Sequence, residues 1–160
     1  MKVVAGLSLV VMLGSVVAWK SLEPTPVPYP EGYRTWTHVK STLISPSHKQ
    51  FATMGGFQHI YANAAAIAGY RARAFPEGSV IAFEWLEMRD NEGTFVEGGR
   101  RQLDVMMKDT VRYASTGGWG FQRYARDSKT ELAAAPTPQT CFACHNQMKK
   151  DGLVLSSYSP

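Results

Sequence analysis

The sequence predicts an α+β protein: an antiparallel, β-rich, sandwich-like domain with short helices and one more helix at its C-terminal end. Strand-length segments of alternating or mostly apolar residues recur through the middle of the chain. Turns that contain glycine or proline separate these segments. Only short stretches follow a helical pattern, whereas a helical bundle needs four long ones. These three observations favour a sheet as the framework.

The expected elements alternate simply along the chain. We expect strands over Trp36–Ile44, Phe57–Tyr61, Ser79–Met88, Arg101–Lys108 and Trp119–Tyr124. We expect helices over Ala64–Arg73 with Asn63 as the N-cap, over one or two turns from Asp109 to Ser115, and over Gln139–Lys150. Along the strand from Ser79, the period of two places Ile81, Phe83 and Trp85 on one face.

The N-terminal region predicts export from the cytoplasm. Lys2 precedes a short apolar run that ends near Ala18, which is typical of a signal peptide over residues 1–18; an uncleaved membrane anchor is the alternative. Alternating prolines over residues 19–31 predict an extended spacer, and residues 32–160 form the domain. We therefore expect a periplasmic protein, or one anchored to the outer face of the inner membrane.

The segment Cys141-Phe142-Ala143-Cys144-His145 is the most specific motif in the chain. It has the C-x-x-C-H spacing of c-type haem attachment, in which two thiols hold the porphyrin and the histidine ligates the iron. A redox dithiol, a zinc site or a plain disulfide would use the same cysteine pair. A zinc site would need further ligands, and the other histidines lie far upstream and are not paired at ligand spacing. The motif therefore predicts one covalently attached haem c with His145 as the metal ligand.

The region around the motif argues against a second strong ligand on the opposite side of the iron. Met148 is the only candidate ligand after the motif, and it lies too close to His145 in sequence to reach the opposite face. His59 or a methionine elsewhere would give the six-coordinate alternative. Met54, Phe57, Met106 and Met107 are candidates to line a pocket, without a ranking among them.

The charge distribution excludes one class of partner. The net charge is +4 at pH 7, and the chain has no long run of basic residues, which argues against a nucleic-acid surface. Arg100-Arg101 and Lys149-Lys150 are expected to be solvated surface residues. They could also serve as a docking face for an acidic redox partner protein.

The order of several short segments resembles the cytochrome P-460 family, including its cytochrome c′-beta branch. The matching segments are Tyr29–Trp36, His59–Asn63, Phe75–Val80, Leu103–Asp109, Gly117–Phe121 and the terminal haem motif. The resemblance implies a sandwich-like domain, a homodimer, and a haem held by one histidine with an open distal side.

The same resemblance assigns two further site residues. Family members of the P-460 type oxidise hydroxylamine and carry a lysine cross-linked to the haem. That lysine position falls at Phe83, which has no nucleophile, and no lysine lies between Lys49 and Lys108. A phenylalanine there resembles the c′-beta branch, which binds diatomic gases. The family's distal acid falls at Asp104, and the alternative for Asp104 is a structural ion pair with Arg100 or Arg101 at a sheet edge.

The sequence therefore favours a mono-haem cytochrome that binds nitric oxide or carbon monoxide in an apolar pocket crowded by Phe83. Two rival functions stay open at this point. One is a hydroxylamine or nitric-oxide oxidoreductase with Asp104 as proton acceptor. The other is an electron-transfer cytochrome with a six-coordinate haem.

Overall fold

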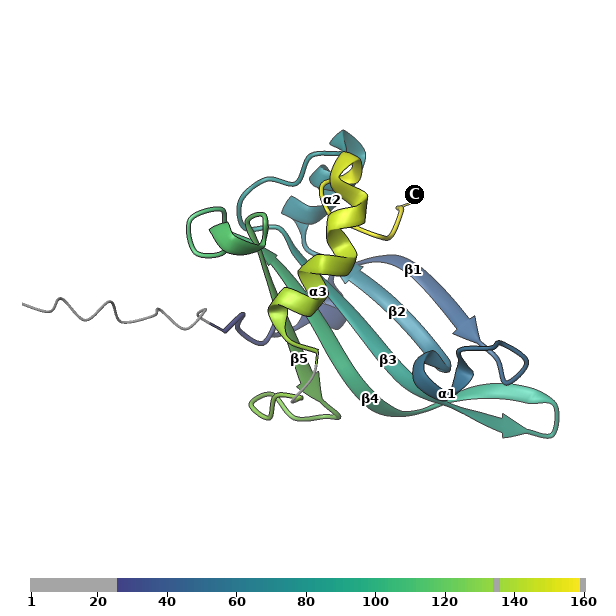
Figure 1. The fold of residues 1–160 in the computed structure, drawn as a ribbon. Helices are drawn as coiled ribbons and strands as arrows, with labels where there is room; N and C mark the ends of the chain where they lie inside the picture. The colour runs from purple at the N-terminus through teal and green to yellow at the C-terminus, as the bar shows by residue number, and fades with distance from the viewer. Residues whose placement is uncertain (1–25, 134–135, 159–160) are drawn as a thin grey trace, which may run out of the picture.

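A five-stranded antiparallel sheet forms the centre of the computed structural model, which describes residues 26–133 and 136–158 (Figure 1). Each strand pairs with the next one in the chain, so the order is β1-β2-β3-β4-β5. The strands are β1 (Thr37–Ile44), β2 (Gly56–Ala62), β3 (Val80–Asn91), β4 (Thr94–Lys108) and β5 (Trp119–Ala125). This architecture confirms the predicted α+β, β-rich class.

Short helical segments connect and cover the strands. They are η1 (Tyr33–Thr35), α1 (Phe51–Met54), α2 (Ala64–Ala72), η2 (Ala114–Thr116), α3 (Pro138–His145) and η3 (Asn146–Asp151). The predicted helix after Asn63 is confirmed as α2, and the Asn63 side chain accepts a hydrogen bond from the backbone N–H of Ala66 as an N-cap.

Three predicted boundaries need correction. The return strand β4 begins at Thr94 rather than Arg101, because the β3–β4 pairing continues to the turn at Asn91 and Thr94. The helical turns expected after Asp109 shrink to the single 3₁₀ turn η2. The C-terminal helix changes character after His145, where η3 continues it as a 3₁₀ segment with non-helical dihedral angles at Met148.

The two faces of the sheet have different coverings. One face, which we call the cavity face, carries Ile60, Phe83 and Asp104, and α3 crosses it (Figure 1). The opposite face, the back face, carries Ala82, Leu103 and Val105 in a buried apolar cluster. Neighbouring strand residues alternate between the two faces because successive side chains of a strand point in opposite directions.

The segment before η1 belongs to the folded domain. The side chain of Val27 is 1% exposed, and its carbonyl accepts a hydrogen bond of 2.6 Å from the Tyr124 hydroxyl. Tyr29 packs on the same back-face cluster. The last residues of the expected spacer therefore cover the sheet, while the predicted signal peptide or anchor lies outside the described residues.

A second apolar cluster fills the space between the cavity face, α2 and the C-terminal segment. It contains Ala66, Ile67, Trp119, Phe121 and Val154. The Trp119 indole donates a hydrogen bond of 2.9 Å to the Gly152 carbonyl, which ties the segment after η3 to β5. No helix within the described residues is long and apolar enough to cross a membrane.

Candidate functional site

A cavity of about 520 Å³ lies between α3 and the cavity face. Both cysteines and the histidine of the C-x-x-C-H motif line it from the α3 side. Its other lining residues come mainly from the sheet and the C-terminal segment, and those used below are Met54, Ile60, Ile81, Phe83, Trp85, Gln102, Asp104, Met106, Phe121, Arg123, Val154, Leu155 and Ser156. A volume of several hundred cubic ångströms is typical of cofactor sites.

Helix α3 presents both thiols to this cavity. The Thr137 side chain caps the helix through the backbone N–H of Thr140, and Pro138 occupies the first turn, where its missing N–H costs nothing. Cys141 and Cys144 are three residues apart, so they lie on one face of the helix. Both are free thiols, and burial, followed by the nearby carboxylate of Asp104, raises the pKa of Cys141.

His145 is held in one orientation by the backbone. Its Nδ1 lies 2.8 Å from the Leu153 carbonyl oxygen, so Nδ1 carries the proton and donates. The other ring nitrogen, Nε2, is left free for a metal, and metal-binding histidines commonly make this hydrogen bond to a carbonyl. Burial lowers the pKa of His145, although the hydrogen bond to Leu153 and the charge of Asp104 oppose that shift. A neutral imidazole is the form that binds iron.

The opposite wall of the cavity is formed by the face of β3 on which the sequence predicted Ile81, Phe83 and Trp85. Ile81, Phe83 and Trp85 all line the cavity, and the Phe83 and Trp85 rings lie 4.9 Å apart between centroids. The described lining residues include no lysine. The side chain that could form the P-460 type of cross-link is therefore absent from the described wall.

Asp104 also lines the cavity, directly across from Phe83 in the β3–β4 pairing. Both of its carboxylate oxygens accept hydrogen bonds from Arg123, at 2.5 and 2.7 Å. Burial disfavours the charged form of Arg123, but the hydrogen bond and charge of Asp104 outweigh burial and raise its pKa. Asp104 is therefore both in the cavity and in an ion pair.

The expected alternative partners of Asp104 lie elsewhere. Arg100 is buried on the back face, where it donates to the hydroxyls of Tyr29 and Tyr33 at 3.0 Å each. Arg101 donates to the Gly55 carbonyl. The ion pair that we assigned to either of these arginines is instead made by Arg123.

The structure divides the other candidate pocket residues. Met54 and Met106 line the cavity. Met107 packs on the back-face cluster instead, and Phe57 stacks on His59 at 6.4 Å between ring centroids. This division follows from strand alternation, because Met106 and Met107 are neighbours and must point to opposite faces.

The position of His59 contradicts its alternative role as a sixth iron ligand. It lies on the back face, where its Nδ1 is 2.6 Å from the Ser41 hydroxyl and its Nε2 is 2.6 Å from a carboxylate oxygen of Glu97. Its strand neighbour Ile60 is the residue that faces the cavity. The whole sheet separates His59 from the thiols.

Two functional contacts escaped sequence reasoning. Arg123 lies on the cavity face with Phe121, two residues before it on β5, and this alternation could have placed it in the site. The Leu153 carbonyl has no such signal, because a backbone oxygen eight residues after His145 contacts it only through the turn that follows η3.

The residues present fit a c-type haem. Two thiols and a free imidazole nitrogen line one side of a cavity whose opposite wall is largely apolar, and the histidine already has the hydrogen bond that orients it. Among the described residues, no group of three or more histidine, cysteine or acidic side chains could hold a metal ion by itself. The arrangement favours a haem over a zinc centre.

Comparison with known proteins supports this conclusion. The sequence matched none of the curated proteins with which it was compared. The family model described as Cytochrome P460 matches residues 30–156, a span that contains every strand and the whole C-x-x-C-H motif. The chain therefore belongs to the cytochrome P460 family and is a haem-binding cytochrome.

Proposed function

We propose that this protein is a mono-haem c-type cytochrome that binds a small diatomic ligand, nitric oxide or carbon monoxide, at an open face of the haem. Cys141 and Cys144 would attach the porphyrin covalently, and His145 would ligate the iron. When bound, the haem supplies the iron on which a diatomic gas binds. The observation that carries the proposal is the cavity with both thiols and His145 on one side and Phe83 on the other.

The distal wall supports gas binding over turnover. Ile60, Ile81 and Phe83 are apolar and offer no proton to a bound ligand. The acid on this wall is already engaged, because Asp104 is hydrogen bonded to Arg123 through both oxygens and also accepts from Gln102. An apolar, crowded distal side favours a small uncharged ligand.

The position of the haem residues also supports an extracytoplasmic protein. Covalent haem attachment takes place outside the bacterial cytoplasm, and the apolar N-terminal run is typical of export. We propose a periplasmic location, or attachment to the outer face of the inner membrane, and a homodimer as the resemblance implies.

The absorption spectrum of the purified ferric and dithionite-reduced protein tests the haem state first. A high-spin spectrum with an ordinary ferrous Soret band is the expected result. A low-spin spectrum without added ligand would support the six-coordinate carrier instead, with Met54 or Met106 as the ligand to test. A strongly red-shifted ferrous Soret band would reveal a cross-link and contradict the proposal.

The Phe83→Ala variant tests the distal assignment. Removing the ring opens the distal side, and we expect the carbon monoxide association rate and affinity to rise about tenfold, equivalent to ~1.4 kcal/mol. Phe57→Ala is the matched control, because Phe57 lies on the back face. Equal rates for the two variants would place Phe83 outside the ligand's path.

A second candidate function is hydroxylamine oxidation, which the position of Asp104 in the cavity favours. To accept a proton, the carboxylate would have to give up one of its two hydrogen bonds with Arg123. Steady-state turnover of hydroxylamine with ferricyanide as the electron acceptor tests this function. Turnover that Asp104→Asn abolishes would establish the enzyme, and we expect no such turnover.

A further inference from the structure

Basic residues gather at the end of the molecule that carries α2 and η3. Arg71 and Arg73 lie at the C-terminal end of α2, and Lys149 and Lys150 lie in η3; all four side chains are exposed. Within the described part of the chain, none of the four forms an ion pair. Among the described residues that line the hollow beside them, Asp151 is the one carboxylate. We call these four cations the basic end.

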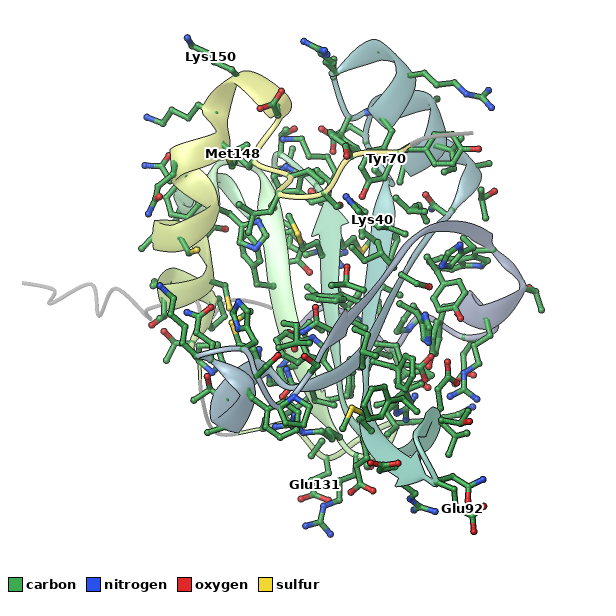
Figure 2. The ribbon with its side chains drawn as sticks, turned by 90° about the vertical axis from the view of Figure 1, so that its right-hand side faces the viewer. Lys40, Tyr70, Glu92, Glu131, Met148 and Lys150 are labelled. Atoms are coloured by element: carbon green, nitrogen blue, oxygen red, sulfur yellow. The ribbon has the colours of Figure 1, made fainter. Side chains whose placement is uncertain are left out.

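The opposite end of the molecule carries exposed residues of both signs, with Arg89 paired to Glu87 and Lys129 paired to Glu31. Figure 2 shows Glu92 and Glu131 at one end of the molecule and Lys150 at the other, with Met148 and Tyr70 near it. Glu92 lies in the turn of the β3–β4 hairpin, where Glu87 and Asp90 are also found. A group of unpaired charges of one sign attracts and orients a partner of the opposite charge before contact.

A hollow of about 470 Å³ opens within the basic end. Arg71, Arg73, Asp151 and Tyr158 line it, and the Tyr70 hydroxyl lies 2.6 Å from the Ser156 hydroxyl at its edge. Val154, Leu155 and Ser156 line this hollow and the haem cavity alike. One short segment of chain therefore separates the basic end from the cofactor site.

The same segment connects to the iron ligand. The Leu153 carbonyl accepts the hydrogen bond from His145, and Leu155, two residues later, is 53% exposed. Leu155 lines the same hollow as Arg71 and Arg73. An exposed apolar side chain beside cations is suited to a brief contact, because small redox interfaces combine a limited apolar centre with a charged rim.

We propose that the basic end is the docking surface for an acidic electron-transfer protein, which exchanges one electron with the haem across the segment 153–156. The proposal rests on the proposed haem site. It commits to a protein with a negatively charged contact face, because four exposed cations gather here and the described lining of the hollow contains one carboxylate, Asp151. Ferrous iron is oxidised to ferric iron, and the partner's oxidised centre gains that one electron, with no bond made or broken.

The test compares two variants with the same change in net charge. Lys149→Glu/Lys150→Glu reverses two charges at the basic end. Lys49→Glu/Arg126→Glu reverses two exposed charges elsewhere, in the loop before α1 and just after β5. Stopped-flow oxidation of the ferrous holoprotein by an acidic plastocyanin, at low and high ionic strength, measures docking.

We expect the Lys149/Lys150 variant to react roughly tenfold more slowly at low ionic strength and to lose most of its salt dependence. The control variant should change less than twofold. Arg71→Glu/Arg73→Glu should repeat the effect from α2, which guards against a haem defect next to His145. Equal slowing of the basic-end and control variants would overturn the proposal.

The outcomes separate this proposal from the proposed function. Oxidation of the holoprotein by plastocyanin needs only a haem that can be reduced first. A low-spin spectrum would therefore refute gas binding, and the docking test could still be interpreted. Conversely, normal carbon monoxide binding combined with identical oxidation rates in all variants would refute docking alone.

Discussion

Two carboxylates of the sheet lie on opposite faces and differ in their access to open space. Glu84 on β3 is 1% exposed on the back face, where Tyr33 donates to it at 2.6 Å and Arg34 pairs with it. Asp104 on β4 lines the cavity and is held by Arg123. The back face satisfies its acid entirely with its own residues, whereas the cavity face keeps open space beside its acid. A polar group in this fold is structural where the protein encloses it and available to a ligand where the cavity reaches it.

The largest expected contrast between the faces is between two histidines. His145→Ala should remove the axial ligand and with it the normal ferrous spectrum, while His59→Ala on the back face should leave the spectrum unchanged. Absorption spectra and the haem content per chain measure both variants. Added imidazole should restore the spectrum of His145→Ala alone. Matching spectra for the two variants would contradict the assignment of the site.

Glu84→Leu should give the largest loss of stability. It leaves the Tyr33 hydroxyl and the Arg34 guanidinium without the carboxylate that accepts from both, and we expect the free energy of unfolding to fall by about 3 kcal/mol. Glu97→Leu is the control, because the Glu97 side chain is 51% exposed and its pair with His59 is worth less than about 1 kcal/mol. Urea unfolding followed by circular dichroism decides the matter, and equal losses would refute the structural role of Glu84.

Tyr70 predicts a loss of stability in alkaline solution. Burial raises its pKa to about 12, against 10 in the unfolded chain, while the hydrogen bond to Ser156 partly opposes this. The unfolded state then releases the proton first, so the contribution is complete below pH 10 and is lost between pH 10 and 12. A pKa difference of two corresponds to about 2.7 kcal/mol, and the partial exposure of Tyr70 reduces the expected loss to about 2 kcal/mol. In the Tyr70→Phe variant, the urea midpoint of unfolding should depend less on pH between pH 10 and 12. An unchanged pH dependence would contradict the assignment of this stability loss to the Tyr70 hydroxyl.

Asp104→Asn should have the smallest effect on folding. The amide oxygen can still accept one hydrogen bond from Arg123, so we expect a loss of about 1 kcal/mol, well below that of Glu84→Leu. The same urea measurement checks it. A loss as large as that of Glu84→Leu would make Asp104 a structural acid after all.

The sheet was predictable because its strands carry their own signals. The alternation along Ser79–Met88 placed Phe83 correctly on the cavity face, and the glycines before Phe57 and Trp119 marked where strands begin. The early start of β4 was not predictable from its composition. The segment from Thr94 to Gly99 is mostly exposed and contains two glycines, and only its pairing with β3 makes it a strand.

The residues for covalent haem attachment could be predicted from the sequence, whereas the contacts around them could be predicted only in part. The C-x-x-C-H spacing identifies its residues by chemistry alone. Asp104 and Arg123 meet because β4 and β5 pair in one particular register. A prediction that treats each strand separately cannot identify such a cross-strand pair. The expected partners of Asp104 were therefore the arginines nearest to it in sequence.

The hydrogen bond that orients His145 depends on the backbone conformation of the residues that supply it. The acceptor is the main chain at Leu153, which has a φ of +69° and donates its own N–H to the Met148 carbonyl, so proline and β-branched residues are disfavoured there. The preceding position is restricted more tightly. Gly152 has a φ of +66°, and a Cβ there would lie 2.8 Å from the Phe75 ring. Selection on the iron ligand should therefore be recorded at Gly152, a residue without a side chain.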